Sequence, residues 1–243
     1  MPCSAPTVVP HYESVSRSPF GCFASRAPAQ PAPEGGTIDV VTAHQPSYRL
    51  AETRAFFASR ADAWDERFPD DGPAFAGAIA ELGLRRGQTV LDAGAGTCRA
   101  AVHLRMAVGT TGRVVAVDVT PEMLAVAATG GRDRQCALLQ ADASVLPLMA
   151  ASVDAVLAAG LVAHLSDPTE GLGELARVTR SGGRLAVFHP IGRATLAARH
   201  GRSPSDDDLL HAPNLANALQ ASGWVADRID DADDRYLALA TRA

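Results

Sequence analysis

Between Thr89 and Pro190 the sequence alternates short apolar runs with longer amphipathic segments, and this alternation restricts the possible folds more than any other feature. The expected strands are TVLDAG, RVVAVDV, CALLQADA, VDAVLAAGLV and GRLAVFHP, and the expected helices among them are TCRAAVHLRMAV, TPEMLAVAAT and PTEGLGELARVT. Strands that are apolar on both faces are covered by helices on both sides, as in parallel sheets. The sequence therefore predicts a doubly wound α/β fold.

The segments that flank this alternation extend the prediction. GWVADRID and DRYLALATR are typical of a hairpin, so an antiparallel C-terminal strand is expected to complete a mostly parallel, Rossmann-like sheet of seven strands. Apolar residues at near-helical spacing predict a helix over residues 47–68 and a second one over 72–84. We also expect Thr97 to cap the helix after TVLDAG, and SDDDLL, residues 205–210, to begin a helix.

Composition favours a small-molecule partner. The chain is 47% hydrophobic with a formal net charge of -5, whereas proteins that bind nucleic acids or anionic membranes usually carry a basic face. We therefore expect neither a nucleic-acid nor a membrane partner, and with no apparent targeting or spanning segment we expect a cytoplasmic protein. The oligomeric state is not indicated. Residues 1–45, which are rich in proline and lack periodicity, are predicted to be disordered, although ordering of this arm over a substrate stays open.

Several kinds of chemistry are not expected, because the sequence lacks the residues or the spacing that they need. All 22 basic residues are arginine, so neither a P-loop lysine nor a Schiff-base lysine is available. The four cysteines are far apart and lack nearby histidines at ligand spacing, which favours free thiols over a zinc site. No carboxylate arrangement has the pattern of a magnesium or calcium site, so no metal is expected.

Three motifs fall at the carboxyl ends of successive predicted strands, where doubly wound sheets bind ligands. The first is Asp92-x-Gly94-x-Gly96, whose glycines let the backbone approach a ligand closely. The second is Asp118, a carboxylate suited to ribose hydroxyls. The third is Asp142-Ala143, a carboxylate and an amide that can bind the edge of an adenine. One such motif alone is weak, but the three together indicate a nucleoside-containing ligand.

From residue 47 to 243 the chain resembles the class I S-adenosylmethionine-dependent methyltransferases, in the small-molecule branch similar to the enzymes of quinone biosynthesis. The motifs that carry the resemblance are VLDAGAGT, VVAVDVTPEML, QADASVLPLMAASVDAV and LARVTRSGGRLAVF. The resemblance implies S-adenosylmethionine as cofactor and methyl transfer to a small-molecule acceptor. It also implies a domain over 46–243, in which 46–85 are N-terminal lid helices, 86–190 the cofactor-binding core and 191–243 a substrate-side insertion with the hairpin.

The resemblance also assigns cofactor-binding residues. Gly94 and Gly96 would line the methionine part, Asp92 would act on its amino group, and Asp118 would hold the ribose. Contacts to the adenine would come from Val119, Asp142 and the Ala143 amide. Ala159 would contribute only backbone, since relatives often have Asn or Ser there. The remaining expected cofactor residues are Ala93, in the first motif, and Trp64, for which a lid over the cofactor and a place in the core are equally open.

A general base is needed only if the acceptor group must lose a proton. His164 and His189 follow the fourth and fifth strands on the cofactor side, and they are the candidate catalytic residues. Structural roles for both stay open.

Two alternatives to methyl transfer remain. A nicotinamide-dependent oxidoreductase would use a similar turn, but position six from Gly94 is Arg99 where its G-x-G-x-x-G fingerprint has glycine. The second alternative is a non-catalytic S-adenosylmethionine-binding protein. It is favoured by Cys98, which stands where a third glycine would continue the pattern Gly94-x-Gly96-x, and by Ala159. Cys98 is expected to affect helix packing more than ligand contact.

Overall fold

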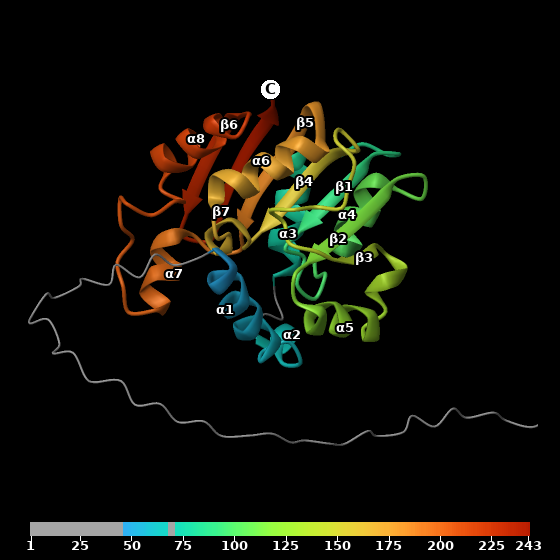
Figure 1. The fold of residues 1–243 in the computed structure, drawn as a ribbon, viewed down its shortest axis with the longest axis horizontal. Helices are drawn as coiled ribbons and strands as arrows, with labels where there is room; N and C mark the ends of the chain where they lie inside the picture. The colour runs from blue at the N-terminus through green and yellow to red at the C-terminus, as the bar shows by residue number, and fades with distance from the viewer. Residues whose placement is uncertain (1–45, 68–70) are drawn as a thin grey trace, which may run out of the picture. The chain divides into compact units, whose positions relative to one another are not determined.

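The computed structural model describes residues 46–67 and 71–243, so the disorder expected over 1–45 lies outside the described residues. Seven strands form one sheet in the order β3-β2-β1-β4-β5-β7-β6 (Figure 1). The strands are β1 (Thr89–Ala93), β2 (Arg113–Asp118), β3 (Ala137–Gln140), β4 (Val153–Ala159), β5 (Thr179–His189), β6 (Trp224–Ala232) and β7 (Arg235–Arg242). The first five are parallel, and β7 pairs antiparallel with both β5 and β6. The predicted seven-stranded α/β fold with its antiparallel hairpin is confirmed.

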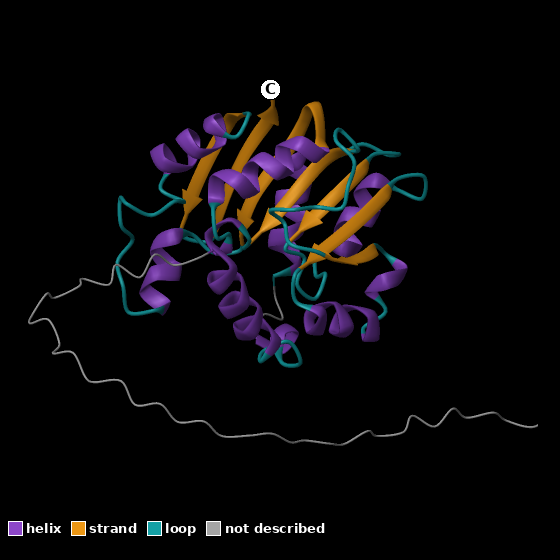
Figure 2. Cartoon of the chain, in the orientation of Figure 1, coloured by secondary structure: helices purple, strands orange, loops and turns teal. Residues whose placement is uncertain are grey.

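Helices cover both faces of the sheet (Figure 2). They are α1 (Pro46–Ala58), α2 (Trp64–Arg67), α3 (Gly72–Leu82), α4 (Ala101–Val108), α5 (Pro121–Thr129), α6 (Pro168–Val178), α7 (Arg193–Arg199) and α8 (Ala212–Ala221), with the short 3-10 helices η1 (Arg132–Arg134) and η2 (Val162–His164). Proline in the first turn favours the starts of α3, α5, α6 and α8. In Figure 1, α1 and α7 lie below the sheet, on the side where the parallel strands end.

The alternation of side chains along each strand divides the core into two clusters. Leu91 of β1 packs in a cluster that includes Leu172 of α6 and Leu215 of α8. Its neighbour Val90 packs in a second cluster that includes Leu104 of α4. Because consecutive strand residues point to opposite faces, apolar runs without polar alternation are what a sheet between two helical layers requires.

The helix expected over residues 47–68 is divided into α1 and α2. At the end of α1, the Ser59 hydroxyl and the Arg60 guanidinium both donate to the Phe56 carbonyl, at 3.0 and 2.8 Å. These side chains satisfy a carbonyl that another helical turn would have satisfied. The connection between the two helices allows Trp64 to begin a separate element.

Two other local predictions are wrong. Thr97 does not cap α4, which begins at Ala101 without a side-chain cap, because the Thr97 hydroxyl donates instead to Asp65 at 2.5 Å. The run SDDDLL does not begin a helix, since α8 starts at Ala212. Asp208 instead accepts from the Ser205 amide and from Arg193, both at 3.0 Å. These contacts hold the run as a turn.

No helix in the described ranges combines the length and the apolar character needed to cross a bilayer.

Candidate active site

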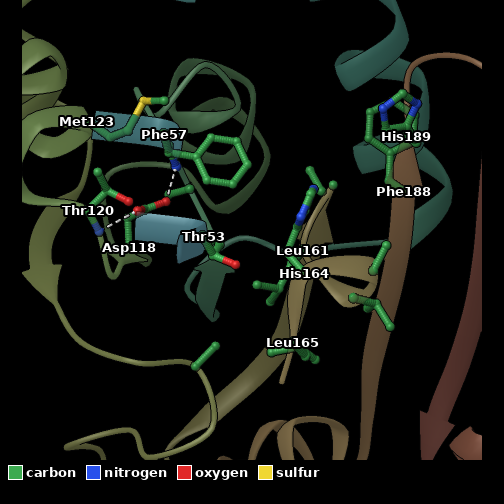
Figure 3. A pocket seen from close by; sticks show the side chains of 18 of the residues that line it. Thr53, Phe57, Asp118, Thr120, Met123, Leu161, His164, Leu165, Phe188 and His189 are labelled. Atoms are coloured by element: carbon green, nitrogen blue, oxygen red, sulfur yellow. Dashed lines mark hydrogen bonds between the residues drawn. The ribbon is translucent and has the colours of Figure 1, made fainter. Parts of the chain in front are cut away.

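A cavity of about 860 Å³ opens at the carboxyl ends of the parallel strands. Its walls come from the segments that follow β1, β2, β3, β4 and β5, and from α1, α2 and α7. In the view of Figure 3, Asp118 lies on one side of this cavity and His189 on the other, with Phe57 and His164 between them. The cavity has a volume in the range of small-molecule and cofactor sites.

The turn after β1 brings the backbone to the cavity wall. Gly94 and Gly96 have φ of 68° and 54°, in the left-handed region that glycine tolerates best. A Cβ on Gly94 would lie 3.0 Å from Leu161, whereas a Cβ on Gly96 would have no protein atom within 4 Å. Gly96 also lines the cavity, so its missing side chain leaves room for a ligand.

Asp118 connects the glycine turn to the end of β2. Its carboxylate accepts from the Gly96 amide at 2.7 Å and from the Thr120 amide at 2.8 Å (dashed in Figure 3). Burial raises the pKa of Asp118, and these two hydrogen bonds oppose that shift. A carboxylate has about four acceptor positions, so two remain for other donors. Asp118 therefore holds the loop as well as facing the cavity.

Asp92 is a carboxylate without a complete set of partners. Its side chain is 1% exposed, and its Oδ2 atom has no hydrogen-bond partner. Burial raises its pKa to about 7, and the nearby charge of Asp118 adds to the shift. Because buried polar atoms are almost always paired, an unpaired oxygen in a residue that lines the cavity indicates a site for a donor or a cation.

The adenine-binding residues expected from the sequence also line the cavity. Val119, Asp142 and Ala143 are among its walls, as is Ala159 at the end of β4. Asp142 accepts from the Ser144 amide at 2.8 Å, which fixes the carboxylate in the turn after β3. Ala93 is the one expected cofactor residue outside the cavity lining, because it is fully buried in β1.

Aromatic side chains from α1 and α2 form part of the wall. Phe57 lies edge-on to Trp64, with ring centroids 5.4 Å apart, and edge-on to His164 at 5.2 Å. Trp64 is half-buried, lines the cavity and packs on Phe57, and it belongs to neither core cluster. The lining residues of α1 include Leu50, Thr53 and Phe57, which share one helical face.

His189, at the end of β5, has its ring held by its own loop. The Nδ1 atom lies 2.9 Å from the Ile191 carbonyl and 3.3 Å from the Ile191 amide. The shorter contact assigns the hydrogen to Nδ1, which leaves the Nε2 lone pair available. Burial lowers the pKa of His189, so the neutral form that can accept a proton predominates at pH 7.

His164, at the end of η2, lines the same cavity. The residue is partly exposed, but desolvation lowers the pKa of its imidazole, and His189 lowers it further. The two candidate bases are therefore close enough to interact electrostatically.

Cys98 lies behind the glycine turn and outside the cavity lining. Its side chain is 1% exposed in the second core cluster, and its φ is 59°. A hydrogen bond with Cys136, together with burial, raises the pKa of the Cys98 thiol. This placement agrees with the expectation that Cys98 affects packing more than ligand contact.

Sequence reasoning left several cavity residues without a role. Arg99 forms an ion pair with Asp71 at 2.5 Å, and Tyr236 of β7 donates to the Leu210 carbonyl at 2.8 Å. All four residues line the cavity. Arg99 and Asp71 are 28 positions apart, and Tyr236 reaches the site only because β7 pairs beside β5. No short-range pattern could have found these residues.

The sheet order, the glycine turn and the acidic strand ends together define the class I methyltransferase fold. Residues 91–187 match the family model described as a methyltransferase domain. Over this stretch the chain is similar to the class I S-adenosylmethionine-dependent methyltransferases.

Curated relatives share this similarity, and a solved structure shares the fold. A demethylmenaquinone methyltransferase from Mycobacterium sp. (strain KMS) is 39% identical over 118 residues, 47% of this chain and 48% of the relative. The ubiquinone/menaquinone biosynthesis C-methyltransferase UbiE from Enterobacter sp. (strain 638) is 34% identical over 114 residues, 44% of each protein. A SAM dependent methyltransferase from Aquifex aeolicus has the same fold, with a TM-score of 0.60 and 23% identity over 80% of this chain and 98% of that chain. The chain spans about half the length of the curated relatives it matches.

The residues present fit the cofactor that the family uses. S-adenosylmethionine carries an ammonium group, which suits the unpaired Asp92 oxygen. It also has a polar tail that needs close backbone approach, which Gly96 permits.

Proposed function

We propose that this protein transfers the methyl group of S-adenosylmethionine to a small-molecule acceptor by in-line displacement and without a metal ion. The observation that carries the proposal is the buried Asp92, which has an unpaired oxygen and lines the cavity together with Gly96, Asp118 and Asp142. A carboxylate in that position is compensated by a bound cation and is otherwise costly.

The roles that we propose follow the order of the strands. Asp92, Gly94 and Gly96 receive the methionine end, Asp118 receives the ribose with its two remaining acceptor positions, and Asp142 with the Ala143 amide receives the adenine. Val119 packs against the adenine ring. When bound, S-adenosylmethionine supplies a methyl group already activated by the positive sulfur, so holding the acceptor in line supplies most of the catalysis, up to about 7–11 kcal/mol.

His189 is the base that we propose for an acceptor that must lose a proton. Its Nδ1 hydrogen is held by the Ile191 carbonyl, so Nε2 takes the proton from the acceptor group. His164 is the second candidate base. Its ring packs beside Phe57, which suits it to contact the acceptor on the side opposite His189. General-base catalysis typically contributes about 10²–10⁴-fold.

A small-molecule acceptor is supported by the relatives, whose names describe methyl transfer to menaquinone and ubiquinone precursors. The family match ends at Val187, however, before α7 and the hairpin contribute their residues to the cavity. The identity of the acceptor is therefore not carried over from these relatives.

Calorimetric titration with S-adenosylmethionine and, separately, with NADH tests the cofactor. We expect micromolar binding of the first and none of the second, and the reverse result would support the oxidoreductase alternative.

Formation of S-adenosylhomocysteine with an acceptor then tests catalysis. This second step matters because the fold neighbours include the [4+2]-cyclase SpnF, with a TM-score of 0.56 and 20% identity. His189→Asn is expected to retain cofactor affinity and lose turnover, and EDTA is expected to change neither.

A further inference from the structure

The part of the cavity wall that α7, β7 and the segments beside them contribute has basic side chains but no acidic ones. Between Ile191 and Tyr236, the lining residues are Ile191, Leu196, Arg199, His200, Arg202, Leu210 and Tyr236. This set holds two arginines and a histidine, and it contains no carboxylate. The acidic lining residues of the described chain, Asp71, Asp92, Asp118 and Asp142, all come from other segments.

The position of α7 is fixed by a third arginine. Arg193 has a side chain that is only 12% exposed, and it pairs with Asp208 at 3.0 Å and with Asp231 at 3.5 Å. Its guanidinium also donates to the Ser205 carbonyl at 2.6 Å, and its amide donates to Asp231 at 2.9 Å. Arg193 is therefore a structural residue that anchors the start of α7, and it leaves Arg199 and Arg202 to face the cavity.

Five arginines line the cavity, and the two that belong to this wall, Arg199 and Arg202, are not neutralised by the carboxylates around them. Arg199 has no ion pair or hydrogen bond among the described residues, and it lies close enough to His189 to lower the pKa of that imidazole, after the larger effect of burial. Arg202 interacts electrostatically with Asp208, but the Asp208 carboxylate is already bound by Arg193 and the Ser205 amide. Elsewhere in the cavity, Arg99 is paired with Asp71.

We infer that the methyl acceptor is an organic acid whose carboxylate binds to Arg199 and Arg202. This inference rests on the proposed function and adds the substrate class to it. The apolar side chains of Phe188, Leu196 and Leu210 line the same cavity, so they receive the body of the acceptor. Guanidinium groups bind carboxylates through paired hydrogen bonds. Because Arg199 is close enough to His189 to affect its pKa, an acid bound there lies beside the proposed base.

The test uses the full chain saturated with S-adenosylhomocysteine, so that only the acceptor side of the cavity is free. The probes are phenylacetate, hydroxycinnamate and indole acetate, each compared with its primary amide, which has the same shape but no charge. Isothermal titration gives the dissociation constant of each probe. We expect at least one acid to bind about tenfold more tightly than its amide.

Substitution assigns that preference to the two arginines. In the double variant Arg199→Gln, Arg202→Gln, the acid and its amide are expected to bind with equal affinity. The matched control is Arg113→Gln, Arg134→Gln, which removes the same charge from two exposed residues outside the cavity and is expected to retain the preference.

Three results would overturn the inference. One is that no acid binds better than its amide, and another is that the preference survives in the Arg199→Gln, Arg202→Gln variant. The third is that this variant loses affinity for S-adenosylmethionine, which would assign the arginines to the methionine carboxylate. Failure of the proposed function differs from all three, because the unsubstituted protein would then either not bind S-adenosylmethionine or bind it without forming S-adenosylhomocysteine from any acceptor.

Discussion

At the scale of single residues, the site contains an unpaired polar atom and an open space that no other residue of the described protein fills. Asp92 is buried with one oxygen unpaired, and Gly96 leaves room where another residue would place a Cβ. The first feature has a cost in the unliganded protein, since a buried carboxylate oxygen without a partner is unfavourable. Both are explained by a ligand that supplies a cation and approaches the backbone.

The pH dependence of Asp92 follows from its raised pKa. The folded-state pKa is about 7 and the ordinary value is 3.8, so the stabilisation from the protonated carboxyl is complete below about pH 4 and is lost as the pH rises from there through 7. An ammonium group bound beside Asp92 favours the charged form. We therefore predict that S-adenosylmethionine binds more tightly at pH 8 than at pH 6, with proton release at pH 6.

Calorimetry in two buffers of different ionisation enthalpy measures that proton release. Asp92→Asn keeps the shape of the side chain and is expected to remove the release and weaken binding. Unchanged proton release in this variant would show that the proton released on binding comes from another group.

Gly96 gives a prediction with a close control. Gly96→Ala and Gly182→Ala both place a Cβ on a left-handed glycine, with φ of 54° and 73°, and neither Cβ would have a protein atom within 4 Å. Each change is expected to cost about 1–2 kcal/mol of stability, measured by chemical denaturation. Only Gly96→Ala is expected to lose S-adenosylmethionine affinity as well, because Gly182 is not a cavity residue. Equal affinity in the two variants would remove the glycine turn from the binding site.

At the scale of elements, α2 is joined to the glycine turn through Asp65. This carboxylate accepts from the Thr97 hydroxyl and pairs with Arg132 at 2.6 Å, and Arg132 in turn donates to the Thr97 carbonyl at the same distance. The contacts connect three segments: α2, the turn after β1 and η1. Because Trp64 precedes Asp65 in α2 and lines the cavity, the connection also sets the position of that aromatic wall.

We predict that Asp65→Ala weakens S-adenosylmethionine binding by up to about eight- to thirtyfold, chiefly through faster dissociation. The estimate combines a partly exposed ion pair, worth about 0.2–1 kcal/mol, with a hydrogen bond worth about 1 kcal/mol. Asp62→Ala removes an exposed carboxylate from the same connection and is expected to bind normally. Stopped-flow measurement of dissociation distinguishes the two variants, and identical rates would contradict a role for the α2 contacts.

At the scale of the whole molecule, the parts that could be predicted are those that depend on nearby residues. The apolar runs identified the strands, and Asp92, Asp118 and Asp142 could be placed together because parallel strands end at one edge. Contacts between distant segments could not be predicted. Thr97, for example, was expected to cap α4 but donates a hydrogen bond to Asp65 of α2. The end of α1 was also missed, since it depends on how Ser59 and Arg60 turn back to the Phe56 carbonyl.

The two tryptophans of the chain occupy very different surroundings. Trp224 is 1% exposed, and its indole donates to the Leu172 carbonyl at 2.9 Å. Trp64 is half-buried on the cavity wall beside Phe57. The molecule therefore contains its own pair of fluorescent reporters: emission from Trp64 should change when a ligand enters, and emission from Trp224 should change when the core unfolds. Occupancy and unfolding could then be followed separately in one unlabelled sample.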